Sequence, residues 1–157
     1  MKLRIILIGK TGKDFLSKGE DEYLKRLKRY IKVERLEISD VRNAKSKSAD
    51  QLKQEEGLMM LAKIENSEFV VILDEKGRDY TSEDLAKWMQ NKMNHVNSNL
   101  TFVIGGPYGF SKEMYERANE KMSLSKMTFS HQMIRMILFE QLYRSFTIIK
   151  NEPYHHQ

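Results

Sequence analysis

The sequence contains no cysteine among its 157 residues, which excludes a disulfide scaffold, a thiolate metal site and a cysteine nucleophile. Only two prolines and eight glycines are present, so there is little room for a low-complexity linker. A chain of this length suits one domain with one core and is too short for two. With 40% hydrophobic and 31% charged residues, we expect a globular single domain over residues 1–157.

The sequence also lacks a long hydrophobic run. Its apolar opening, Leu3 to Ile8, is short and is interrupted by Arg4. A signal peptide needs an apolar core of roughly seven to fifteen residues, and a membrane helix needs about twenty. We therefore expect a cytoplasmic protein with no membrane partner. The charged residues give 27 − 22 = +5, a modest excess that favours a polyanionic partner.

Four short apolar runs predict strands. Three of them are nearly continuous and rich in Ile and Val, as is typical of strands buried on both faces of a parallel sheet. The fourth, Val33–Ile38, alternates with charged residues, and we expect it at an edge of the sheet. The other three runs are Leu3–Ile8, Phe69–Leu73 and Leu100–Ile104.

Helical patterns lie between these runs, and Ser111 is placed to cap the last of them. The predicted helices are Asp14–Lys32, Ala49–Ile64, Ser82–Val96 and Ser111–Lys121. This alternation predicts an α/β fold, with a parallel sheet and helices on both faces. Arg42–Asp50 is polar and basic without apolar periodicity, and we interpret it as an exposed loop.

The segment Met133–Ile149 differs from the other helical patterns, because eleven of its seventeen residues are apolar. A surface helix needs an apolar stripe on one side only. We expect this helix to pack on the sheet with one face and on something else with another. A second subunit is the simplest candidate.

Two glycine-containing segments raise the question of a nucleotide site. Gly9-Lys10-Thr11 resembles the end of a P-loop, but position 4, where the first glycine should be, is Arg. The dinucleotide fingerprint G-x-G-x-x-G is also missing. Gly105–Gly109 directly follows a predicted strand, where parallel sheets bind ligands. The paired glycines there indicate equally a close-approaching ligand or a tight turn.

The histidines do not show the spacing of metal ligands, so we expect no metal. Glu140 and Arg144 are spaced for an ion pair within one helix. His131 and Arg135 have the same i, i+4 spacing, and two potential cations on one face would repel each other. A nearby anion such as a phosphate would resolve that repulsion.

Six segments taken in order form a specific set that runs from residue 1 to the end, although each motif alone is weak. They are Met1–Lys10, Leu73–Gly77, Ile104–Gly109, Leu124–Arg135, Glu140–Arg144 and Pro153–His155. Together they closely resemble one family, the small bacterial H-type methyltransferases of the SPOUT class, which modify a pseudouridine in large-subunit ribosomal RNA.

The resemblance implies a SPOUT-type parallel α/β domain with a C-terminal trefoil knot, a homodimer, and S-adenosyl-L-methionine bound in the knot. It also implies which residues border that cofactor: one at a strand exit, one in the glycine loop and a continuous run after it. These are Leu73, Gly105, Leu124, Ser125, Lys126, Met127, Thr128 and Phe129.

The resemblance further implies methylation of ring nitrogen N3 of the pseudouridine of the position-1915 type in 23S ribosomal RNA, within the large subunit or the ribosome. The imide nitrogen must lose its proton, so a base or a stabilising cation would help. The candidate catalytic residues are His131, Arg135, Tyr154 and His155. We favour the tail, residues 151–157, because a short mobile segment can close over a docked base.

Two residues depart from the family pattern. His156 stands where Arg or Lys is usual, which affects the charge of the tail, and Ser130 stands where Pro is usual, which affects loop rigidity. Two other functions remain open: a non-catalytic RNA- or ribosome-binding dimer, and a methyltransferase of the same class acting on transfer RNA. The basic charge fits all three functions.

Overall fold

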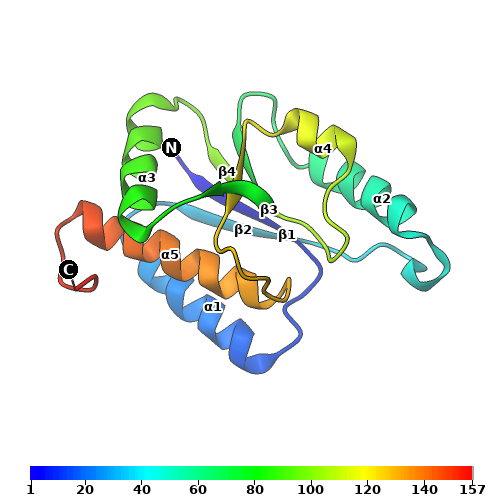
Figure 1. The fold of residues 1–157 in the computed structure, drawn as a ribbon, viewed down its shortest axis with the longest axis horizontal. Helices are drawn as coiled ribbons and strands as arrows, with labels where there is room; N and C mark the ends of the chain where they lie inside the picture. Colours follow the sequence, from blue (N-terminus) through cyan, green and yellow to red (C-terminus); the bar gives the residue numbers. More distant parts are fainter. Residues whose placement is uncertain (157) are drawn as a thin grey trace.

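The computed structural model describes residues 1–156, and a sheet of five parallel strands forms its centre (Figure 1). The strands lie in the order β2-β1-β4-β3-β5. Their bounds are β1 Leu3–Ile8, β2 Val33–Ile38, β3 Phe69–Asp79, β4 Leu100–Ile104 and β5 Glu120–Ser123. The parallel sheet and its four predicted strands are confirmed, and β2 lies at an edge as its polar pattern indicates. Strand β3, however, continues past the predicted Leu73 to Asp79.

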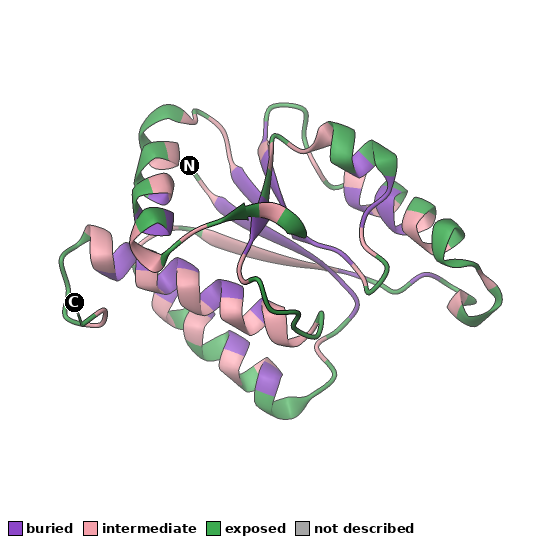
Figure 2. Cartoon of the chain, in the orientation of Figure 1, coloured by how far each residue is buried: buried purple, intermediate pink, exposed green. Residues whose placement is uncertain are grey.

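Helices cover both faces of the sheet, as the sequence predicts. The helices are α1 Asp14–Leu27, α2 Ala49–Leu61, α3 Ser82–His95, α4 Lys112–Arg117 and α5 Met133–Ile149, with a short 3-10 turn η1 at Ala44–Ser46. Leu3, Ile5 and Leu7 of β1 pack in one core with α1, α3 and α5. Ile6 and Ile8 point to the opposite face, where α2 and α4 close a second core. Figure 2 shows the central strands as the most buried part of the chain.

Several predicted boundaries were wrong. The first helix ends at Leu27 instead of Lys32, because the chain turns there before entering β2. Helices α2 and α3 end at Leu61 and His95, short of the predicted bounds. The predicted loop Arg42–Asp50 contains η1 and the start of α2, where Ser48 and Gln51 form a capping box.

Strand β5 was missed, and the prediction of a helix through Lys121 was wrong. Ser111 does cap α4, but the helix ends at Arg117 because Ala118 has an extended conformation, with ψ of 135°. The backbone N–H of Asn119 then donates to the carbonyl oxygen of Val70 at 2.8 Å. Its side-chain oxygen accepts from the N–H of Val70 at 2.7 Å. These two bonds align the polar segment Glu120–Ser123 beside β3.

Helix α5 has the predicted bounds and packs against both α1 and α3 on one face of the sheet (Figure 1). These neighbours cover part of its apolar surface, so the sheet is not its only contact within the chain. Several apolar residues of α5 stay partly exposed: Met133, Ile134, Met136, Ile137, Ile148 and Ile149. Within residues 1–156, none of the helices has the length and apolar character needed to span a membrane.

Candidate functional site

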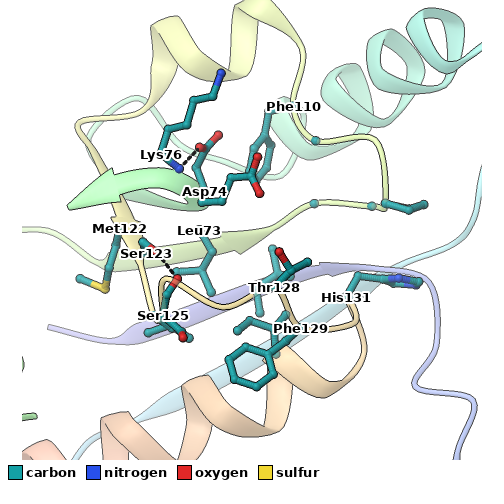
Figure 3. Close-up of a pocket in the computed structure, with 18 of the residues that line it drawn as sticks. Leu73, Asp74, Lys76, Phe110, Met122, Ser123, Ser125, Thr128, Phe129 and His131 are labelled. Atoms are coloured by element: carbon teal, nitrogen blue, oxygen red, sulfur yellow. Dashed lines mark hydrogen bonds between the residues drawn. The ribbon is translucent and has the colours of Figure 1, made fainter. Parts of the chain in front are cut away.

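A cavity of about 580 Å³ opens at the carboxyl ends of β3 and β4. Three segments far apart in the sequence supply most of its walls (Figure 3). They are residues 73–76, the exit of the apolar part of β3, where its pairing with β5 shifts register; residues 104–110, around the glycine loop; and the segment 122–131 that runs from β5 to the start of α5. In parallel sheets this edge is where ligands bind, so the cavity is the candidate site.

The exit of β3 is tied to α4 through Asp74. One carboxylate oxygen of Asp74 accepts from the backbone N–H of Lys76 at 2.8 Å, and the other accepts from the hydroxyl of Tyr115. Burial, together with the bond to Asp74, raises the pKa of Tyr115 to about 12. Tyr115 is therefore a neutral donor at physiological pH. Its hydrogen bond joins α4 to β3 at the cavity.

The glycine loop, residues 105–109, forms the second wall. It closes in a tight turn in which the N–H of Gly109 donates to the carbonyl of Gly106 at 3.2 Å. A β-carbon on Gly105 would lie 3.1 Å from the ring of Phe110. The tight turn expected from the sequence is confirmed. The loop also lines the cavity, and the close approach of a ligand there stays a prediction. Tyr108 at its tip is 56% exposed.

The third wall, Leu124–Ser130, is shaped by serine hydroxyls. Ser123 donates to the carbonyl of Ser125 at 2.8 Å, and Ser125 accepts from the N–H of Met127 at 2.9 Å. Ser130 accepts from the N–H of Met133 at 3.1 Å, at the entrance to α5. A proline at position 130 would restrict the backbone but would lack this hydroxyl. Ser130 instead orders the loop through its hydrogen bond to Met133.

The cavity brings together seven of the eight residues expected to border the cofactor. Lys126 is the exception, since it is exposed and is not among the lining residues described. His131 also lines the cavity and is exposed. The seven lining residues are Leu73, Gly105, Leu124, Ser125, Met127, Thr128 and Phe129.

Arg135 does not join His131 in the cavity. It is fully buried, and its guanidinium donates to the carbonyl oxygens of Ile8 and Gly9 and to the hydroxyl of Thr11. Burial lowers the pKa of Arg135. The sequence interpretation that one anion lies between His131 and Arg135 is thus not supported, because Arg135 is occupied with the backbone at the end of β1.

The tail lies at the other end of α5 from the cavity (Figure 1). The hydroxyl of Tyr154 donates to Glu140 at 2.9 Å. Burial is the main cause that raises the pKa of Tyr154, and the bond to Glu140 adds to it. Glu140 also forms the predicted ion pair with Arg144, at 2.6 Å. His156 is exposed, and Gln157, the last residue of the predicted tail, lies outside the described residues.

His155 is held between two charged side chains. Its Nδ1 lies 3.0 Å from a guanidinium nitrogen of Arg144, and its Nε2 lies 2.8 Å from a carboxylate oxygen of Glu83. Arg can only donate, so Nδ1 is the acceptor and Nε2 carries the hydrogen. In this arrangement both ring nitrogens of His155 are engaged.

Within residues 1–156, no group of three or more His, Asp or Glu side chains is placed to hold a metal ion. Two features of the site escaped the sequence reasoning. One is the bond between Tyr115 and Asp74, although an Asp directly after a buried strand is a usable signal. The other is Glu56, which lies behind the glycine loop and whose polar sequence context gives no signal.

Comparison with known proteins agrees with this architecture. A family model described as "Predicted SPOUT methyltransferase" matches residues 1–155. The "Ribosomal RNA large subunit methyltransferase H" of Christiangramia forsetii is 50% identical over the full length of both chains. The proteins of the same name from Parabacteroides distasonis and Cytophaga hutchinsonii are 48% and 51% identical, over 100% and 99% of this chain and all of theirs.

Among solved structures, a probable methylase family protein from Haemophilus influenzae matches with a TM-score of 0.53 and 13% identity. The match covers 95% of this chain and 66% of that one, and it supports the fold alone. With the family model and the full-length relatives, the class is defined: the chain belongs to the SPOUT methyltransferase family.

Proposed function

We propose that this protein methylates ring nitrogen N3 of the pseudouridine of the position-1915 type in 23S ribosomal RNA, with S-adenosylmethionine as the donor. The names of its full-length relatives support a large-subunit ribosomal RNA substrate. The observation that carries the proposal is the cavity, because it gathers the strand exit, the glycine loop and the segment after β5. The family's knot and the cytoplasmic location are part of the same proposal.

The residues present fit this cofactor. A volume of about 580 Å³ is within the usual range for small-molecule sites, roughly 300–1,000 Å³. Gly105 and Gly106 present bare backbone to the cavity, so a ligand can approach closely. Leu73, Gly105 and the run Leu124–Phe129 would hold it, and when bound it supplies a methyl group on a positively charged sulfur.

The acceptor nitrogen must lose a proton, and two of the four histidines, His131 and His155, are candidates to accept it. His131 is exposed at the cavity and is free to approach a base that enters there. His155 is engaged by Arg144 and Glu83, so it would need to exchange a partner before taking a proton at Nδ1. Tyr154 is a neutral hydroxyl whose raised pKa suits donation better than proton abstraction. Arg144 beside the tail supplies a permanent cation for a developing anion.

A homodimer completes this site. The tail is docked on α5 and on Glu83 of α3, away from the cavity of its own chain. A docked tail therefore acts in a cavity only if a second copy brings its α5 alongside. The partly exposed apolar residues of α5 supply a surface for that contact. We propose one functional domain with residues 151–157 as its tail.

The test is methylation of ribosomal particles with isotopically labelled S-adenosylmethionine, followed by mapping of the modified nucleotide. We expect label on N3 of one pseudouridine and none on particles that carry uridine there. Label on transfer RNA would instead support the transfer-RNA enzyme. RNA binding without cofactor binding at millimolar S-adenosylmethionine, measured by calorimetry, would leave only the non-catalytic RNA-binding dimer.

A further inference from the structure

Glu56 of α2 is a buried carboxyl that the fold does not explain. It is 6% exposed, and its Oε1 has no hydrogen-bond partner within residues 1–156. Burial raises its pKa, and the nearby carboxylate of Asp40 raises it further. Buried polar atoms in native proteins are nearly always paired. Leaving one unpaired destabilises the fold, and an apolar side chain of similar length would avoid that penalty.

The carboxyl of Glu56 faces the glycine loop. A β-carbon on Gly106 would lie 2.6 Å from its Oε2 and 2.9 Å from its Oε1, closer than any real side chain allows. Gly106 also lines the cavity. The backbone of this one residue therefore has the cavity on one side and the carboxyl of Glu56 on the other. A side chain at position 106 would therefore have to displace the carboxyl of Glu56.

The contact between Glu56 and the loop is fixed by its surroundings. The next residue, Gly57, packs so closely on Ser111 that a β-carbon would lie 2.3 Å from the serine hydroxyl. Ser111 in turn caps α4. Met60 of the same helix is fully buried in the core that includes Phe110 and Met114. Helix α2 is thus anchored directly after Glu56, which keeps the backbone of Glu56 beside the loop.

Gly105 and Gly106 of the loop have different supports. Phe110 packs against Gly105 and carries no polar atom in its side chain. Glu56 packs against Gly106 and brings an unpaired oxygen with it. An apolar side chain such as that of Phe110 would be enough to pack against a glycine. The polar atoms of Glu56 point to a role in the function of the loop.

We propose that Glu56 is a positioning residue for the methyl transfer proposed above: its carboxyl supports Gly106 from behind the cavity and bonds the loop backbone when the loop closes on the cofactor. The inference rests on the proposed function and names a residue of that same site. In the free protein the oxygen stays unpaired. Cofactor binding then gains a hydrogen bond that the free protein lacks.

The test replaces the carboxyl with an apolar group of similar length, Glu56→Met, and measures two quantities. Thermal unfolding of the free protein is expected to shift upward by about 2–6 °C, because an unpaired buried atom is removed. The dissociation constant for S-adenosylmethionine, measured by calorimetry, is expected to rise about fivefold, the value of one ordinary hydrogen bond. A purely structural residue would move stability and affinity in the same direction.

The matched control is Glu55→Met on the same helix. Glu55 is paired with Lys47 at 2.6 Å, and its replacement makes the same change of side chain one position away on the same helix. It is expected to leave cofactor affinity unchanged. Glu56→Gln, which keeps both a donor and an acceptor, should retain affinity within about twofold. Glu56→Asp, which is one methylene shorter, should lose it.

The outcomes separate the two proposals. If the unchanged protein does not bind S-adenosylmethionine, the proposed function fails and the inference fails with it. If it binds, and Glu56→Met binds equally well or is less stable, only the inference is overturned. If Glu56→Met does not fold, the comparison of Gln with Asp decides: equal affinities for these two variants overturn the inference.

Discussion

Arg135, in the first turn of α5, donates a hydrogen bond to the carbonyl oxygen of Gly9 at 2.9 Å, across 126 residues of sequence. The same guanidinium bonds the carbonyl of Ile8 and the hydroxyl of Thr11. Gln132 adds a second link, since its side-chain oxygen accepts from the N–H of Gly12 at 3.0 Å. The start of α5 is therefore joined to the end of β1, next to the cavity wall that leads into α5.

Arg135→Met is expected to destabilise the protein by about 2–4 kcal/mol, because two buried backbone carbonyls lose their donor. Urea unfolding at neutral pH measures this loss. Arg135→Lys, which keeps the charge and part of the donor set, should lose less. His131→Ala, on an exposed residue, should leave unfolding unchanged and lower only the methylation rate. If Arg135→Met kept normal stability but lost methylation activity, Arg135 would instead take part in the reaction.

Gly77 of β3 gives a second prediction. A β-carbon there would lie 2.6 Å from the backbone N and C atoms of Met122 in β5, which cannot move aside as a side chain can. Gly77→Ala should therefore separate β3 from β5 and destabilise the fold by about 1–3 kcal/mol. It should also weaken cofactor binding, because Met122 lines the cavity.

Gly12→Ala is the control for this substitution. A β-carbon on Gly12 meets only side-chain atoms of Gln132, at 3.7 Å and beyond, which is ordinary contact. We expect Gly12→Ala to be neutral or to stabilise the fold by about 0.4–1 kcal/mol, because alanine lowers the conformational entropy of the unfolded chain. Equal effects of the two alanines in thermal unfolding would contradict the close-approach argument.

The sheet could be predicted from the sequence because three of its strands contain nearly continuous apolar runs, and a buried parallel strand has few other interpretations. Strand β5 could not, because Glu120–Ser123 is polar and short. Its pairing depends on the bonds between Asn119 and Val70, which have no local pattern. The helix ends were overextended because apolar periodicity continued into turns such as the one that follows Leu27.

The candidate site could likewise be predicted from the sequence only in part. Leu73 ends one apolar run and Gly105 directly follows another, so topology alone places them at one edge of the sheet. The positions of Arg135 and Glu56 could not be foreseen, since a burial this complete is exceptional for charged residues and arises from tertiary contacts. The spacing of His131 and Arg135 indicated a shared helix face, but His131 precedes α5 and is not on the helix.

Tyr115 predicts a pH dependence of stability at alkaline pH. Its pKa is about 12 in the folded protein against an ordinary value of 10, because burial and the bond to Asp74 favour the neutral hydroxyl. A raised folded-state pKa means that this stabilisation is complete below pH 10. It is lost as the pH rises from about 10 to 12. Tyr115→Phe should reduce the change of unfolding free energy with pH in this window. If that pH dependence stays the same, another group causes it.

The tail offers the prediction that separates binding from reaction most clearly. Tyr154 and His155 contact Glu140, Arg144 and Glu83, and these contacts lie outside the cavity. Deleting residues 153–157 should therefore leave cofactor affinity unchanged. It should also preserve the dimer, while single-turnover methylation of ribosomal particles collapses. Calorimetry and sedimentation on the same preparation provide the control, and full activity in the deletion would refute a role for the tail.

Single substitutions in the tail then resolve what each residue does. Tyr154→Phe removes the hydroxyl that donates to Glu140 and keeps an aromatic face, so a large loss of rate would implicate the hydroxyl and a small one the ring. His156 is exposed, and His156→Arg introduces a permanent charge there. If this position meets a phosphate, RNA binding should strengthen, and the slope of log affinity against log salt should steepen by about 0.7–0.9. An unchanged slope, measured by filter binding between 50 and 200 mM salt, would place His156 away from the RNA backbone.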